Sequence, residues 1–209
     1  MDRTTDGQRI VIFHSALGLR PAILDTAEAL RAAGHTVDTP DLYDGQTFDD
    51  LDAGIAKRDA LGIPEVLRRT QAAVADLPPE LVYVGYSMGT GPAELLAATR
   101  PGARAAILLH GALAPAEIDV QAWPGVPVQI HHARHDPWVD VDQVRALEDA
   151  VRKAGATAEV HVYERGGHLF EDPASTEPDS EAARLVLERV LAFIDRLPST
   201  GATGGRLAS

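Results

Sequence analysis

The stretch Leu81-Val82-Tyr83-Val84-Gly85-Tyr86-Ser87-Met88-Gly89-Thr90-Gly91 decides the fold of this chain. Its first four residues are leucine, valine and tyrosine, a composition typical of a buried strand. Residues 93–98, Ala-Glu-Leu-Leu-Ala-Ala, favour a helix. Between them Ser87 stands in a Gly-x-Ser-x-Gly pattern, whose glycines permit a sharp turn and close backbone approach. The stretch therefore predicts a strand, a tight turn that holds the Ser87 hydroxyl clear of the backbone, and a helix.

Strand-like and helix-like segments alternate on both sides of this stretch. Apolar runs predict strands at residues 10–13, 37–39, 81–84, 105–109, 126–131 and 158–163. Helical patterns are found at residues 21–33, in a segment that ends near residue 76, and at residues 93–98, 140–154 and 180–197. This alternation predicts an α/β fold of three layers, with a mostly parallel sheet of about six strands and helices on both faces. Functional residues of such sheets gather on loops at the carboxyl ends of the strands.

Length and composition fit one globular domain. The chain has 209 residues, of which 45% are hydrophobic, enough to bury a sizeable core. We expect a single domain over residues 1–198. Residues 199–209 are rich in Gly, Ser and Thr, a composition that predicts a disordered tail.

Charge and cysteine usage exclude several classes of function. The formal net charge of -12 argues against nucleic-acid binding, which depends on clustered Lys and Arg, and it argues weakly against an acidic membrane surface. No apolar run is long enough to span a bilayer, and residues 1–9 are polar. Because the chain has no cysteine, it has no disulfide, no thiolate zinc site and no thiol nucleophile. These features predict a cytoplasmic protein.

A serine hydroxyl needs a base within hydrogen-bond reach and a third group that orients the base. Asp136 lies just beyond the strand at 126–131, and His168 lies in a Gly-Gly-His loop just beyond the strand at 158–163. Serine, acid and histidine occur in this order, each after a strand, in α/β-hydrolases. We therefore predict Ser87 as nucleophile, His168 as general base and Asp136 as the acid.

Two other aspartates compete for the role of the acid. Asp140 precedes the helical pattern that begins nearby, and Gln143 stands three residues later, as in a capping box. Asp140 is therefore interpreted as a helix N-cap, and Asp142 is the other competitor. Asp136 remains the better candidate.

An oxyanion hole needs two donors aimed at the developing negative charge. The backbone N–H of Met88 is expected to be one, helped by the positive end of the helix that follows. The loop at residues 14–18 after the first strand is expected to supply the other, from the N–H of Ala16. The alternative is that this loop is a plain connection between a strand and a helix.

The same loops carry residues that would wall a substrate pocket. These candidates are Ser15, Tyr43, Tyr86, His110, Trp123, Trp138 and Phe170. Aromatic residues in such loops are equally often edges of the core. His131, His132 and His135 form a cluster, but alternation along a strand sends the first two to opposite faces, so no metal site is predicted.

The chain resembles the dienelactone hydrolase family of the α/β-hydrolase superfamily. The resemblance extends from about residue 10 to residue 197 and is carried by four motifs: Asp41-Leu42-Tyr43, Gly85-Tyr86-Ser87-Met88-Gly89, His135-Asp136 and Gly166-Gly167-His168-Leu169-Phe170. It implies an α/β-hydrolase fold, a small lidless hydrolase with a cysteine or serine nucleophile, and a triad of Ser87, Asp136 and His168.

Two departures from the family pattern bear on the substrate. Members that open dienelactones resemble one another in a cysteine nucleophile and a glutamate after the first strand, where this chain has Ser87 and His14-Ser15. They also carry an arginine soon after the histidine to hold a substrate carboxylate, whereas Glu171-Asp172 follows Phe170 here. An acidic pair is expected to repel a carboxylate. We therefore expect a serine esterase that cleaves a small neutral ester or lactone through an acyl-enzyme.

Other functions use the same residues or the same fold. Thioester cleavage and perhydrolysis need the same triad, and a catalytically silent hydrolase fold can serve as a ligand receptor. A peptide or phospholipid substrate is a further alternative. No cofactor is expected, the predicted partner is a small-molecule ester, and the protein is expected to be a monomer or a homodimer. The segment at residues 171–179 is a candidate cover for the pocket.

Overall fold

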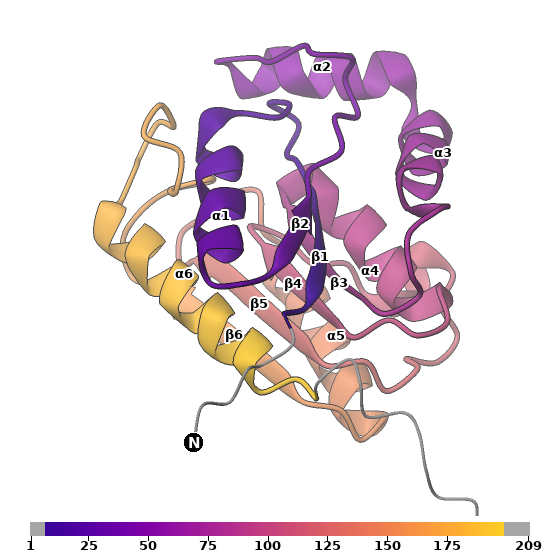
Figure 1. Cartoon of the computed structure of the whole chain (residues 1–209). Helices are drawn as coiled ribbons and strands as arrows, with labels where there is room; N and C mark the ends of the chain where they lie inside the picture. Colours follow the sequence, from indigo (N-terminus) through magenta and orange to yellow (C-terminus); the bar gives the residue numbers. More distant parts are fainter. Residues whose placement is uncertain (1–6, 199–209) are drawn as a thin grey trace, which may run out of the picture.

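A parallel sheet forms the centre of the structure, a computed structural model that describes residues 7–198 (Figure 1). Its six strands lie in the order β2-β1-β3-β4-β5-β6. The strands are β1 (Arg9–Phe13), β2 (Thr36–Asp38), β3 (Leu81–Tyr86), β4 (Ala105–Leu109), β5 (Val128–Ala133) and β6 (Ala158–Tyr163). Every neighbouring pair is parallel, so the predicted fold class is confirmed. The tail predicted at residues 199–209 lies outside the described residues, and the single domain over residues 1–198 stays a prediction.

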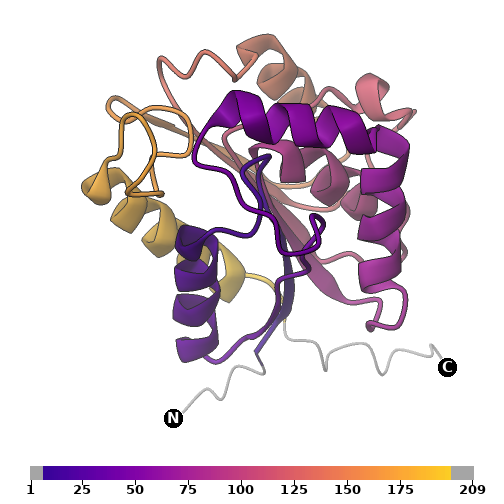
Figure 2. The same ribbon diagram turned by 90° about the horizontal axis from the view of Figure 1, so that it is seen from above.

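Helices cover both faces of the sheet. One face packs against α1 (Pro21–Ala32) and α6 (Ser180–Asp195), and the other packs against α3 (Ile63–Val74), α4 (Thr90–Thr99) and α5 (Val141–Lys153) (Figures 1 and 2). A further helix, α2 (Leu51–Leu61), crosses the end of the sheet instead of covering a face (Figure 2). Within residues 7–198 no helix is both long enough and apolar enough to cross a bilayer.

The register of the strands brings their carboxyl ends to one edge. Phe13 pairs with Gly85, Leu109 pairs with both Tyr86 and His131, and Ala133 pairs with Tyr163. The loops that follow β1, β3, β4, β5 and β6 therefore open side by side. These loops carry every residue of the predicted triad.

Most element boundaries differ from the sequence prediction by a few residues, and two of the differences have a clear structural cause. The helical segment that ends near residue 76 is split into α2 and α3 at Gly62, whose φ of 79° lies in the left-handed region that glycine adopts readily. The strand predicted at residues 126–131 is β5, which begins at Val128 and continues to Ala133. Pro127 has no backbone N–H and cannot donate to the ladder, which explains the later start.

Candidate active site

The turn between β3 and α4 places Ser87 at the carboxyl edge of the sheet. Ser87 begins the short 3-10 helix η1 (Ser87–Gly89). Its φ is 48°, a backbone conformation that residues other than glycine rarely adopt. Thr90 supports the turn, because its hydroxyl donates to the Ser87 carbonyl oxygen over 2.7 Å. A Cβ atom on Gly85 would lie 2.3 Å from the Gly89 carbonyl oxygen, and a Cβ on Gly89 would lie 2.3 Å from that of Phe13. Any larger residue at either glycine of the motif would therefore clash with the backbone.

The three predicted residues of the triad lie in one hydrogen-bonded chain. His168 Nε2 lies 2.8 Å from Ser87 Oγ, and His168 Nδ1 lies 2.8 Å from Asp136 Oδ2. The Asp136 side chain is fully buried, and its other oxygen accepts a hydrogen bond from the Trp138 N–H over 2.9 Å. This geometry allows His168 to take the Ser87 proton while Asp136 holds the ring.

Asp136 is kept in its charged form. Burial alone would raise the pKa of its carboxyl group, but the hydrogen bond with His168 and the nearby His110 ring, whose Nδ1 lies 3.5 Å from Asp136 Oδ2, outweigh burial and hold the pKa well below its usual range. The acid is therefore a carboxylate whenever His168 must carry a positive charge.

The competing aspartate has the structural role that its position indicates. Asp140 is the N-cap of α5, and its side chain accepts hydrogen bonds from the N–H groups of Asp142 and Gln143. The expected capping-box partner differs: the Gln143 side chain accepts a hydrogen bond from the Ala114 N–H and so ties α5 to the loop after β4.

The loop after β1 is tightly folded around the peptide of Ala16. The Leu17 N–H donates to the Ser15 hydroxyl, and the Gly18 N–H donates to the Ser15 carbonyl oxygen. His14 joins this loop to the segment after β2, because its Nε2 accepts a hydrogen bond from the Leu42 N–H over 2.9 Å. Burial lowers the pKa of His14, consistent with a neutral ring in this structural role.

Gly54 of α2 presses against the same peptide. A Cβ atom at this position would lie 2.3 Å from the Ala16 carbonyl oxygen. The close contact holds the Ala16 peptide at the edge of the site, which explains why the buried residue of α2 is a glycine.

Gly54→Ala is therefore expected to push the Ala16 peptide out of place and to lower kcat/KM roughly tenfold or more, because the Ala16 N–H is a predicted oxyanion donor. Ala56→Ser, on the exposed face of the same helix, serves as the control. Steady-state kinetics with a short ester and a thermal melt measure the effect. Unchanged kinetics in a folded Gly54→Ala protein would exclude this role for the Ala16 peptide.

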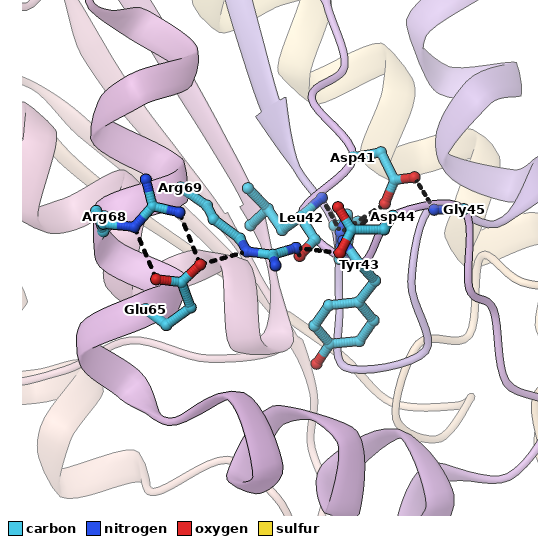
Figure 3. Close-up of polar contacts among 9 residues, drawn as sticks. Asp41, Leu42, Tyr43, Asp44, Gly45, Glu65, Arg68 and Arg69 are labelled. Carbon is cyan, nitrogen blue, oxygen red and sulfur yellow. Dashed lines mark hydrogen bonds and ion pairs between the residues drawn. The ribbon is translucent and has the colours of Figure 1, made fainter.

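A network of charged residues fixes the segment after β2 to α3 (Figure 3). Glu65 accepts hydrogen bonds from Arg68 and Arg69, and Arg69 also contacts the Leu42 carbonyl oxygen and Asp44. Asp41 accepts from the N–H groups of Tyr43 and Gly45 in the same segment. The buried Tyr43 then donates its hydroxyl to Met88 Sδ over 3.1 Å, so this network supports the residue next to the nucleophile.

A cavity of about 650 Å³ borders Ser87 on the side of α3 and α4. Its apolar wall comes from both helices and from the loop after β4: Ile63, Val66, Leu67, Leu95, Leu113 and Ile118. Arg58, Glu117 and Asp119 also line this cavity, here called the apolar cavity. Its size and lining suit an apolar acyl or alcohol group of modest length.

Glu94 supports the wall of the apolar cavity from below. This residue of α4 is fully buried, and its Oε1 accepts a hydrogen bond from the Leu113 N–H over 2.9 Å. Burial raises the pKa of Glu94 well above its usual range, so the side chain is a neutral acid. The sequence interpretation took it as an ordinary helix former, since a single charged residue in a helical pattern gives no sign of burial.

A second cavity, of about 440 Å³, borders His168. Trp138 lines it, with its ring centroid 6.0 Å from that of His168, and Asp49, Asp50 and Asp52 lie along its rim. Residues 174–176 form part of the wall. The segment at 171–179 is held there by backbone hydrogen bonds, including one from the Gly167 N–H to the Glu177 carbonyl oxygen.

Several residues predicted as pocket walls lie elsewhere. Tyr86 faces a different cavity of about 330 Å³ between α1 and α6, and Phe170 is buried against His110. Trp123 is buried in the core, where its Nε1 donates to the Val126 carbonyl oxygen over 2.6 Å. Tyr43 acts from beneath Met88, and Ser15 is buried in its own loop. Apart from Trp138, the predicted aromatic side chains are therefore part of the core or of other contacts. Aliphatic residues of α3 and α4 line the cavity beside Ser87.

The expected repulsion by Glu171 and Asp172 is wrong, because both charges have internal partners. Glu171 Oε2 lies 2.5 Å from His110 Nε2, and Asp172 Oδ2 lies 2.5 Å from Arg20 Nε. Neither carboxylate is presented to a substrate as a free charge. The signal that sequence reasoning missed is the pairing of each acid with a buried base more than sixty positions away.

Two histidines of the cluster, His131 and His132, are buried and contact other groups of the protein, whereas His135 is exposed. His131 is buried between Tyr163, 2.8 Å from its Nδ1, and the Gln129 side chain, 2.9 Å from its Nε2. Burial lowers the pKa of His131 well below its usual value, so the ring is neutral. Within residues 7–198 the one group with a metal-like arrangement is His110, Asp136 and His168, whose ring and carboxylate atoms already contact one another.

Comparisons with known proteins identify the family and the fold. The sequence pattern of the dienelactone hydrolase family matches residues 3–197. A carboxymethylenebutenolidase of Rhodococcus opacus is 28% identical over 217 residues, covering 95% of this chain and 84% of that protein. Among solved structures, a dienelactone hydrolase-like promiscuous phosphotriesterase from metagenomic libraries superposes with a TM-score of 0.77 at 22% identity, covering 93% of this chain and 88% of the other. A thermophilic esterase of Thermogutta terrifontis with propionate bound gives a TM-score of 0.63 at 18% identity, over 93% and 85% of the two chains. The structures share the α/β-hydrolase fold.

Proposed function

Because the chain belongs to the dienelactone hydrolase family and is a hydrolase of ester bonds, we propose that it cleaves small neutral carboxylic esters or lactones through Ser87, His168 and Asp136. The observation that carries this proposal is the chain of two 2.8 Å contacts that joins the three side chains. The R. opacus relative is named for opening a lactone, and the T. terrifontis structure is that of an esterase with a carboxylate bound. Both names are consistent with acyl transfer.

The proposed reaction forms and then hydrolyses an acyl-enzyme. His168 Nε2 takes the proton from Ser87 Oγ as the oxygen attacks the substrate carbonyl carbon. Asp136 orients the ring and stabilises its charged form. The alcohol leaves with the proton that His168 returns, and a water molecule activated by the same histidine then releases the acid.

The proposed oxyanion donors are the N–H groups of Met88 and Ala16. Met88 follows the nucleophile in η1, where the positive end of the helical segment favours a developing negative charge. Ala16 follows β1, the strand next to β3, and its peptide is held by the Gly54 contact.

The charges around the two cavities favour a neutral substrate. Glu117 and Asp119 line the apolar cavity, and Asp50 and Asp52 line the cavity beside His168 together with Asp49, which is paired with Arg20 at 2.7 Å. Arg58 lines the apolar cavity, but its guanidinium contacts Asp59 at 2.7 Å. A substrate carboxylate would therefore meet mainly negative charge, whereas an apolar group would pack against the aliphatic side chains of the apolar cavity.

Leu95→Trp is expected to shorten the apolar cavity. Turnover of p-nitrophenyl octanoate should fall about tenfold in kcat/KM while that of the acetate changes less than about threefold, because only the longer chain reaches the filled space. Leu24→Trp, on the exposed side of α1, is the matched control. Equal losses on both esters would show that the acyl group binds elsewhere.

A panel of esters, lactones and thioesters tests the proposal as a whole, together with labelling by a fluorophosphonate probe. The proposal expects turnover of at least one short neutral ester and covalent labelling of Ser87. Inactivity on the whole panel, with no labelling of a folded protein, would contradict it and would favour a silent receptor.

A further inference from the structure

His110, the residue that follows β4, lies between two carboxylates that come from different loops. Its side chain is fully buried. Nε2 lies 2.5 Å from Glu171 Oε2, and Nδ1 lies 3.5 Å from Asp136 Oδ2. The chain of contacts through the site therefore runs from Glu171 through His110, Asp136 and His168 to Ser87.

The backbone holds His110 in this position at some cost. Its φ of 61° lies in the left-handed region, a conformation that costs energy and that often occurs at functional sites. Its N–H donates to the His131 carbonyl oxygen over 2.8 Å, which fixes the residue to the neighbouring strand. The Phe170 ring packs edge-on against the imidazole, with 4.7 Å between the two ring centroids.

Only one protonation state of His110 suits both neighbours. A neutral imidazole carries one N–H and one lone pair, so either tautomer turns a lone pair towards a carboxylate. The imidazolium carries an N–H at each nitrogen, one towards Glu171 and one towards Asp136. The arrangement of two acids around a buried ring is therefore favourable only when His110 is charged.

The titration behaviour agrees with this reasoning. Burial by itself lowers the pKa of His110, but the carboxylates of Glu171 and Asp136 outweigh burial and raise the pKa to about 9. The other ionisable groups that face His110 are His168, whose ring centroid is 5.4 Å away, and His131 on β5, which burial keeps neutral.

We propose that His110 is a positioning residue: an imidazolium at neutral pH, held by Glu171, that fixes the carboxylate of Asp136 and sets the alkaline limit of activity. This inference rests on the function proposed above, since it concerns the same triad. His110 lines neither of the two cavities beside Ser87 and His168. It acts on the base through Asp136, by giving the carboxylate a second cationic neighbour beside His168.

The role makes a specific prediction for the pH profile. Below about pH 9, the protonated His110 attracts Asp136 and holds it in place. When His110 loses its proton above that pH, a lone pair faces the carboxylate, and the alignment of Asp136 with His168 weakens. We expect kcat/KM to fall above about pH 9 with the loss of a single proton.

Two variants separate this role from simple packing. Glu171→Gln keeps the shape but removes one carboxylate, so the alkaline fall should move to lower pH by one unit or more. His110→Gln retains a donor towards Glu171 but cannot titrate, so kcat/KM should be about 10- to 100-fold lower, the scale of a misplaced catalytic group, with no alkaline fall up to pH 10. Glu164→Gln, which removes an exposed carboxylate at the end of β6, is the control and should keep the wild-type profile. An alkaline fall that stays in place in both variants would overturn the proposal.

A measurement on the wild-type protein gives a readout independent of turnover. Long-range ¹H–¹⁵N NMR distinguishes an imidazolium from either neutral tautomer, and the His110→Gln spectrum assigns the resonance. We expect a His110 imidazolium at pH 7.5 that titrates near pH 9. A neutral His110 at pH 7.5 would overturn the inference even in an active esterase. Failure of the ester panel alone would instead contradict the proposed function and leave the NMR result as the test of the charge.

Discussion

Ser87→Ala is expected to abolish ester hydrolysis, with kcat/KM lowered by at least about 10⁴-fold. The loss is this large because Ser87 Oγ is the atom that forms the covalent bond to the acyl group in the proposed mechanism. The Ser87 turn itself should survive, since its support comes from Thr90 and from the close packing of Gly85 and Gly89. Alanine removes only the oxygen atom.

The measurement compares initial rates on a short p-nitrophenyl ester for the wild type, Ser87→Ala and Ser180→Ala. Ser180 is an exposed residue at the start of α6, so its variant should match the wild type in rate and in melting temperature. Activity of Ser87→Ala within about tenfold of the wild type would mean that another residue or a bound water is the nucleophile.

The second large effect is expected at the acid of the triad. Asp136→Asn should lower kcat about 10³- to 10⁴-fold, because an amide in place of the carboxylate no longer accepts reliably from His168 Nδ1 and no longer stabilises the charged ring. The variant also leaves His110 with one carboxylate neighbour instead of two, so the loss of charge reaches both histidines.

Asp140→Asn is the matched control for this substitution. It makes the same chemical change in the same loop, but at the N-cap of α5, where asparagine is also a good cap. We expect unchanged kinetics and a stability within about 1 kcal/mol of the wild type. If Asp140→Asn were the variant that lost activity, the acid would have been assigned to the wrong residue.

Local patterns predicted the sheet and the three positions of the triad. The strands at 105–109 and 158–163 have the bounds that were expected, because short buried runs between turn residues are read reliably from composition. Once the strands are placed, a parallel sheet brings their carboxyl ends together, so residues just after strands become neighbours. Ser87, Asp136 and His168 could be chosen as the candidate triad for this reason, and their side chains do lie in contact.

Pairing across long sequence distances was not predictable in the same way. Glu171 and Asp172 are adjacent in sequence and have the pattern of a single acidic pair. In the structure their partners come from different loops: His110 after β4 and Arg20 before α1. Nothing in the local sequence distinguishes a solvated acid from a paired one, because the pairing is decided by which loops meet. The burial of Glu94 within its correctly predicted helix was not predictable for the same reason.

The sequence by itself determined the order of elements, the turn that presents Ser87 and the order of the proposed nucleophile, acid and base, since these depend on short-range composition and on the rule that parallel strands end together. The tertiary structure alone decided the lining of the apolar cavity, the contact of Gly54 with the Ala16 peptide and the two carboxylate neighbours on which the proposed charge of His110 depends. Each of these depends on distances between segments far apart in the chain. In a buried site, where the effective dielectric constant is low, such short distances strongly change the pKa values and the packing of the groups involved.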